Sequence, residues 1–139
     1  ILEIAQMVKE FFSVRDFRRG QTLILLDVDI WDFEELFETM EGSARYLEYS
    51  IYKTLSTLEP DRKLMETDSL YQSNKYFENY RLEKDPWLYQ TQKSTYSYVL
   101  GFNIARLLDK LDIEYKSRLF VEEDATLEQI LRSYFEVNK

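Results

Sequence analysis

The feature that most constrains this sequence is a long periodic stretch from Asp32 to Leu58. Apolar residues recur in it every three or four positions, which is the spacing of one face of an α-helix. They are Phe33, Leu36, Phe37, Met40, Ala44, Leu47, Ile51, Leu55 and Leu58. Asp32 is suited to cap the start of this helix, and Pro60 follows its end. Because Tyr46 and Tyr49 lie on the opposite side, we expect a central helix that is covered on more than one face.

Few residues in the chain favour turns. The 139 residues include only three glycines and two prolines, on which all-β folds depend for their turns. With 45% hydrophobic and 16% aromatic residues, the chain is apolar enough to form one hydrophobic core. We therefore predict a mostly α-helical single domain over residues 1–139, built from about five to six helices.

Further segments show the same helical spacing of apolar residues. They lie at residues 2–14, 95–111, 115–120 and 126–135. The last begins with a capping box, formed by Thr126 and Gln129. The expected inward-facing residues are Leu100, Ile104, Leu107, Leu108, Leu111, Leu127, Ile130, Leu131 and Phe135. Residues 22–30 end in alternating apolar and acidic residues, which is compatible with either a short strand or a buried connector.

Charge and residue types exclude several functions. The net charge is −8 and the lysines and arginines are scattered, so neither nucleic acid nor an anionic membrane surface is an expected partner. Without cysteine there is no disulfide and no thiolate metal site. Without histidine, the commonest metal ligand and the commonest general base are both missing. Catalysis by this chain alone must therefore use carboxylates, lysine or tyrosine, and the compartment stays open.

Gly42 lies inside the long predicted helix, where glycine costs roughly 1 kcal/mol relative to alanine. On a helical wheel Glu41 falls about 80° from the centre of the apolar stripe, so its carboxylate is expected to be partly buried. Gly42 falls roughly opposite the stripe, where a missing side chain lets another backbone pass close by. A simpler explanation is that Glu41 pairs with Arg45 one turn later and that Gly42 only relieves crowding.

The predicted helix at 95–111 carries Tyr98, Gly101 and Ala105 along one flank. Small residues one and two turns beyond a tyrosine leave a groove under its ring, with the hydroxyl at the mouth. The alternative is a seam of small residues for tight helix packing, beside an ordinary amphipathic tyrosine.

These two stretches resemble motifs of one enzyme family. "EGSARYLE", beginning at Glu41, resembles the E-G-x-A-x-Y helix of gluzincin zinc metallopeptidases, in which HExxH is combined with a downstream glutamate as third zinc ligand. "YSYVLGFNIARLLDKL" is similar to the Y-x-x-G-F helix of that family. The resemblance implies that Glu41 is a metal ligand and that Tyr98 is the catalytic tyrosine that stabilises the oxyanion. It also implies that Gly101 and Gly42 belong to the substrate-binding cleft.

The histidines of such a site are absent. A catalytic zinc ion needs three protein ligands and an open position for water, and two of the three ligands in this family are histidines. On a longer spacing, "LEIAQ" places Leu2 and Gln6 where the histidines belong and Glu3 where the general base belongs. Leucine cannot ligate zinc, and an amide is a poor ligand. Either the metal site has been dismantled, or the HExxH helix lies upstream of Ile1.

The resemblance implies the helical C-terminal part of a metallopeptidase-like domain that has no competent zinc site in this chain. It is either a fragment of a longer zinc peptidase or a degenerate domain that keeps its cleft for a peptide or protein partner. No cofactor is expected in this chain, zinc is expected only if a longer parent supplies the histidines, and the chain alone should not hydrolyse peptides. The alternative is a helical interaction or scaffold domain unrelated to peptidases, in which Glu41 and Tyr98 would lie far apart. If the resemblance holds, Arg45 or a nearby tyrosine should orient Glu41.

Overall fold

The computed structural model describes residues 2–71, 79–90 and 95–137, and over these residues the fold is all-α, without a strand. The helices are α1 (Leu2–Leu26), α2 (Trp31–Phe37), α3 (Ser43–Leu55), α4 (Arg62–Thr67), α5 (Thr95–Lys110), α6 (Lys116–Val121) and α7 (Leu127–Phe135). A π-helical segment, η1 (Glu38–Gly42), joins α2 to α3, and two short 3-10 turns, η3 (Leu82–Lys84) and η4 (Pro86–Tyr89), precede α5. The predicted helical class is confirmed.

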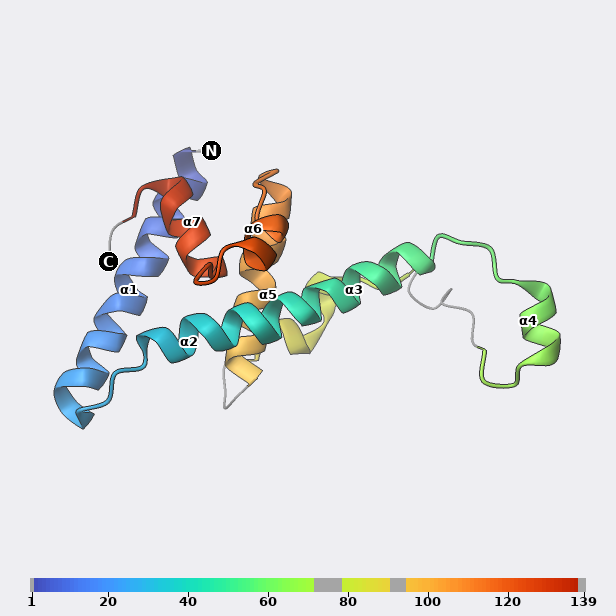
Figure 1. Cartoon of the computed structure of the whole chain (residues 1–139), viewed down its shortest axis with the longest axis horizontal. Helices are drawn as coiled ribbons and strands as arrows, with labels where there is room; N and C mark the ends of the chain where they lie inside the picture. Colours follow the sequence, from blue (N-terminus) through green and yellow to red (C-terminus); the bar gives the residue numbers. More distant parts are fainter. Residues whose placement is uncertain (1, 72–78, 91–94, 138–139) are drawn as a thin grey trace.

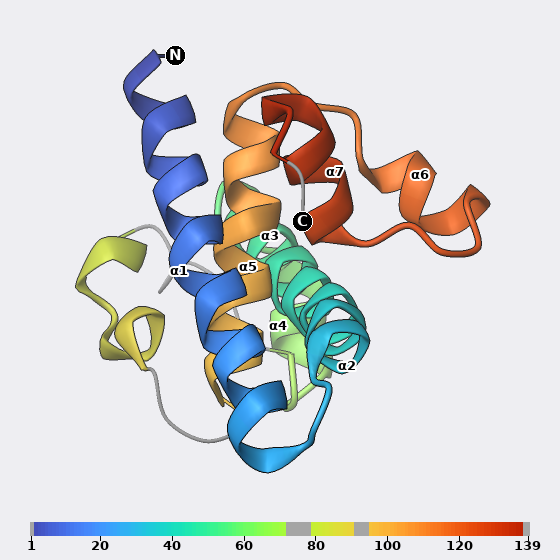
Figure 2. The same ribbon diagram turned by 90° about the vertical axis from the view of Figure 1, so that its left-hand side faces the viewer.

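The segments α2, η1 and α3 form one continuous rod (Figure 1). Helices α1, α5, α6 and α7 gather around the first part of this rod, whereas α4 lies beyond its far end. Viewed from the end of the rod, α1 and α5 lie on one side of it and α6 stands on the other (Figure 2). None of the helices in the described ranges is both long enough and apolar enough to cross a bilayer.

The main core lies among α1, α5 and α7. Its buried side chains are Val8, Phe12, Ile104, Ala105, Leu108, Tyr115, Leu127, Ile130, Leu131 and Phe135. Leu100, Leu107 and Leu111 pack against this core, so the inward faces predicted for residues 95–111 and 126–135 are confirmed. The capping box is also confirmed, because the backbone N–H of Gln129 donates to the Thr126 hydroxyl at 3.1 Å.

The expectation of a strand near 22–30 is wrong. Helix α1 runs through these positions to Leu26, and Asp27 ends it with a φ of 52°, in the left-handed region. Aspartate tolerates this conformation better than most residues. A strand also needs a paired backbone beside it, and no other strand exists among the described residues.

The expectation that the long helix is covered on its apolar face is also wrong. Phe33, Met40 and Leu47 are 65%, 60% and 59% exposed, although they belong to the predicted apolar stripe. The face packed against the other helices carries Glu35 and Glu38, which are 2% and 1% exposed. Helical spacing identifies the two faces of a helix, but the partners supplied by other helices decide which face is buried. Here those partners are charged.

Candidate functional site

The helices that carry the two predicted motifs cross at Gly42 and Gly101. A Cβ atom on Gly42 would lie 2.6 Å from the backbone nitrogen of Phe102 and would overlap the backbone of Gly101. A Cβ atom on Gly101 would overlap the carbonyl group of Glu38. Segment η1 and helix α5 therefore touch backbone to backbone, which only glycine allows. The prediction that Gly42 lets another backbone pass is confirmed, and the two glycines form a packing seam; a contact of either with substrate stays a prediction.

The π-helical geometry of η1 separates two neighbouring glutamates. Glu38 points into the molecule and is 1% exposed, whereas Glu41, three residues later, is only partly buried. Single π-turns inside α-helices are rare and are found frequently at functional sites. Segment η1 thus presents one carboxylate to the interior and another to the surface.

Glu41 and Tyr98 lie close together and line the same cavity. The Glu41 carboxylate beside the Tyr98 hydroxyl is the main reason that the pKa of Tyr98 is raised. The Tyr98 ring also packs edge-on against Phe37, with 6.2 Å between the ring centroids. At neutral pH Tyr98 is therefore a neutral donor held beside a carboxylate.

A cavity of about 550 Å³ opens between these two groups and the start of α5. It is lined by Glu41, Ala44, Arg45, Glu48, Trp87, Thr95 and Tyr98. Arg45 forms an ion pair with Glu48, and its guanidinium lies 5.0 Å from the centroid of the Trp87 ring. The proposed pairing of Arg45 with Glu41 is therefore not what the structure shows. The other option, orientation of Glu41 by a nearby tyrosine, stays a prediction.

A second cavity, of about 290 Å³, adjoins the first and shares Arg45, Glu48 and Trp87 with it. Its remaining walls are Tyr49, Tyr52, Tyr80, Leu82 and Phe102. This aromatic cavity has a polar edge where it meets the first, so together the two can accommodate a polar main chain and a flat or apolar side chain.

Glu3 lies elsewhere. It is exposed near the start of α1, Leu2 is 88% exposed, and Gln6 donates to Glu10 at 2.8 Å. Helix α1 contacts η1 through Arg15, which lies more than two helical turns beyond Gln6. The structure does not bring Glu3 to Glu41 and Tyr98, so its role as a general base stays a prediction without geometric support.

The residues around Glu41 do not fit a zinc ion. The other carboxylate on the cavity wall, Glu48, is paired with Arg45. Among the described residues, no group of three or more Asp, Glu, His or Cys side chains is placed to hold a metal. Since the whole chain lacks histidine and cysteine, Glu41 has no companion of the type that zinc prefers.

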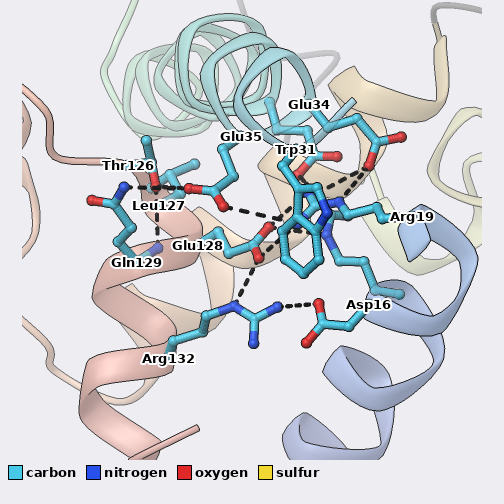
Figure 3. A network of polar contacts seen from close by, with 12 residues as sticks. Asp16, Arg19, Trp31, Glu34, Glu35, Thr126, Leu127, Glu128, Gln129 and Arg132 are labelled. Atoms are coloured by element: carbon cyan, nitrogen blue, oxygen red, sulfur yellow. Dashed lines mark hydrogen bonds and ion pairs between the residues drawn. The ribbon is translucent and has the colours of Figure 1, made fainter. Parts of the chain in front are cut away.

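The sequence did not predict a second group of titratable side chains, which is buried where α1, α2, η1 and α7 meet (Figure 3). We call it the buried ion network. It consists of Arg15, Arg19, Glu34, Glu35, Glu38, Glu128 and Arg132. Glu128 is its centre: Arg19 donates to both of its carboxylate oxygens at 2.9 and 3.0 Å, Arg15 donates at 2.9 Å, and Arg132 at 2.8 Å.

Carboxylates outnumber guanidinium groups in this network, and the pKa values reflect the imbalance. Burial alone would raise the pKa of Glu128, but Arg15, Arg19 and Arg132 outweigh it and hold this pKa below its usual value. Glu38 receives one donor, Arg15, at 2.6 Å, and its Oε1 is buried without a hydrogen-bond partner among the described residues. Burial consequently raises the pKa of Glu38 to about 7.

The sequence did contain a signal for this network. Val8, Phe12, Arg15 and Arg19 follow one another at helical spacing, so the arginines continue the apolar face of α1. All four are buried. Arginines in line with an apolar face indicate carboxylates on the elements packed against it, because an unpaired buried charge is too costly.

Comparisons of the chain with protein-family models, with curated proteins and with solved structures each found no match. The functional proposals below therefore depend on the geometry of the residues.

Proposed function

We propose that the cavity between Glu41 and Tyr98 binds an extended peptide segment, in a metallopeptidase-like domain that lacks a competent zinc site in this chain. The observation that carries the proposal is the placement of the Tyr98 hydroxyl beside the Glu41 carboxylate in the lining of one open cavity. This juxtaposition is what the peptidase resemblance requires, since both groups must reach one substrate carbonyl group.

The pair matches the hydrogen-bonding pattern of a peptide backbone. On binding, the Tyr98 hydroxyl turns from Glu41 to a peptide carbonyl oxygen, and Glu41 accepts from a neighbouring peptide N–H. The adjoining aromatic cavity receives the side chain that follows, and its walls of Tyr52, Trp87 and Phe102 favour a flat or apolar group.

Two versions of the proposal differ in the source of the histidines. As a fragment, the chain belongs to a longer peptidase that supplies HExxH, and a parent reading frame without an upstream HExxH would exclude this version. As a degenerate domain, the chain binds peptide without metal. Zinc titration of the 139-residue chain by calorimetry is expected to show no site of micromolar or tighter affinity, and finding one would argue against the degenerate version.

The direct test is fluorescence anisotropy with a set of labelled, acetylated hexapeptides that differ in their central residue. Tyr98→Phe removes only the hydroxyl group and Glu41→Gln only the charge, so each should weaken binding by about five- to tenfold. Glu3→Gln is the matched control and should leave affinity unchanged, because Glu3 is exposed far from the cavity. The proposal fails if no peptide binds the unmodified chain, or if Tyr98→Phe and Glu41→Gln bind as well as it does.

A second function, a helical interaction or scaffold domain, is favoured by a different observation. The apolar stripe of the long helix is exposed over its whole length. A partner that binds there would be insensitive to Tyr98→Phe and Glu41→Gln, which separates the two functions experimentally.

A further inference from the structure

The exposed face of the long helix is unusually apolar. We call it the outward stripe; it consists of Phe33, Leu36, Met40, Ala44, Leu47, Ile51, Leu55 and Leu58. Its seven side chains larger than alanine are between 38% and 65% exposed. Together they expose on the order of 700 Å² of apolar surface, which is larger than most monomers leave uncovered and close to the ~800 Å² that one partner buries in a standard interface.

The outward stripe has the shape of a helix-binding groove. Its residues follow one another in steps of three or four along α2, η1 and α3, with Leu58 just beyond the end of α3, so they form a band roughly 35 Å long. On one side α6 forms a wall, and the hollow between α3 and α6 has a volume of about 440 Å³, with Leu47 and Phe120 in its lining. On the other side lies the cavity of Glu41. Ala44 lines both hollows. Because its side chain is small, a second helix could approach the surface closely at this point.

The charges beside the stripe indicate a basic occupant. The neighbouring cations are already paired, Arg45 with Glu48 and Lys116 with Asp109. Among the described residues Glu41 has no ion-pair partner, and the whole chain has a net charge of −8. Lysines or arginines on the flanks of an apolar helix would therefore complement this surface.

A second copy of the chain fits less well. The sequence intervals between successive stripe residues are the same when counted from either end. Two copies would therefore pair antiparallel about the midpoint between Ala44 and Leu47. Helix α6 stands beside that midpoint, and the pairing would bring the α6 helices of both copies to the same side of the interface. It would also bring together two surfaces of the same negative charge.

We propose that the outward stripe is the docking site of an amphipathic helix from outside this 139-residue chain, apolar along one face and flanked by lysine or arginine. The inference deepens the interaction function described above and does not depend on peptide binding between Glu41 and Tyr98. The apolar contacts supply the affinity, and the basic flanks select the partner and its orientation.

The test uses two synthetic helical peptides with leucines in steps of three and four, one flanked by lysine and one by glutamate. We expect the lysine peptide to bind the unmodified chain with a Kd in the micromolar range, and the glutamate peptide about tenfold more weakly or worse. The double variant Leu47→Glu, Ile51→Glu should bind the lysine peptide at least about tenfold more weakly. A matched control changes two exposed apolar residues of α1, Phe17→Glu and Ile24→Glu, and should change binding by less than about twofold.

Circular dichroism establishes that both double variants stay folded, as expected for changes at exposed positions. Tyr98→Phe should bind the lysine peptide as the unmodified chain does, so a failure here is distinguishable from a failure of the cleft proposal. Equal binding by the stripe variant and the control variant would overturn the inference. It would also be overturned if sedimentation showed a dimer of the unmodified chain that Leu47→Glu, Ile51→Glu abolishes, since the occupant would then be a second copy.

Discussion

The two faces of the long α2–η1–α3 helix differ in burial, and in the opposite direction from what their residue types suggest. The inward face holds Glu35, Glu38 and Gly42, all buried, whereas the outward face holds the apolar residues of the outward stripe. The inward face is stabilised by specific partners: arginines from α1 meet its carboxylates, and the backbone of α5 meets its glycine. The outward face has no such partner within the described residues.

The difference shows that the polarity of a helix face does not by itself decide its burial. A buried carboxylate is tolerated when guanidinium groups surround it, but removal of one member then leaves the others uncompensated. An exposed apolar side chain contributes little to folding and can be replaced at little cost. Mutations on the two faces should therefore have very different effects on the free energy of unfolding.

The largest effect is expected at the centre of the buried ion network. Glu128→Gln removes the charge that three arginines share and should lower the free energy of unfolding by about 3–5 kcal/mol in urea denaturation. The matched control is Glu122→Gln, which breaks an exposed ion pair with Arg118 and should cost less than about 1 kcal/mol. Similar losses for the two variants would mean that the network is not a buried unit.

The next largest effect is expected at the helix crossing. Gly42→Ala places a methyl group against the backbone of Gly101 and should lower the free energy of unfolding by about 3 kcal/mol. Gly20→Ala is the control, since no atom lies within 4 Å of the position of its new Cβ. It should stabilise the protein by roughly 0.5–1 kcal/mol, because alanine favours a helix more than glycine does. A neutral Gly42→Ala would contradict the close crossing.

A third, pH-dependent effect concerns Glu38. Its pKa is about 7 in the folded protein, raised by burial from 4.5, so the folded state binds the proton more tightly than the unfolded state. Stability should therefore fall as the pH rises from 4.5 to 7, by on the order of 1–3 kcal/mol. Glu38→Gln cannot ionise and should lose this decline. Denaturation of both proteins across this range checks the prediction, and parallel curves would contradict it.

The smallest effect is expected on the outward face. Leu47→Gln replaces a leucine that is 59% exposed and should change the free energy of unfolding by no more than about 0.5 kcal/mol. Leu108→Ala, in the core of α5, should cost about 2–5 kcal/mol in the same experiment. If Leu47→Gln were as costly as Leu108→Ala, the outward face would be buried in solution and the comparison of the two faces would be wrong.

Local rules predicted much of the fold. The faces of α5 and α7 and the capping box at Thr126 depend on residues within a few turns of one another. Gly42 marked a position where another backbone could pass, although its partner, Gly101, is distant in the chain. The sequence did not predict which face of the long helix is covered, because that depends on Arg15 and Arg19, which are distant in the chain. Since charged residues in a helix are usually solvated, the spacing of these arginines was not recognised as a buried face.

The residues predicted for the candidate site also fall into two groups, those that the structure brings together and one that it does not. The pair of Glu41 and Tyr98 was expected from two short motifs, and the structure places both side chains in the lining of one cavity. Glu3 was expected from the short string LEIAQ alone, and it lies near the exposed start of α1. A helix crossing holds Glu41 and Tyr98 near each other, whereas Glu3 does not line that cavity.

The bond between Arg15 and Glu128 joins positions 113 residues apart. During synthesis, Arg15 and Arg19 leave the ribosome long before Glu128, the carboxylate that both of them share, has been translated. The core shared by α1, α5 and α7 and the ion network beside it can therefore be completed only after α7 has emerged.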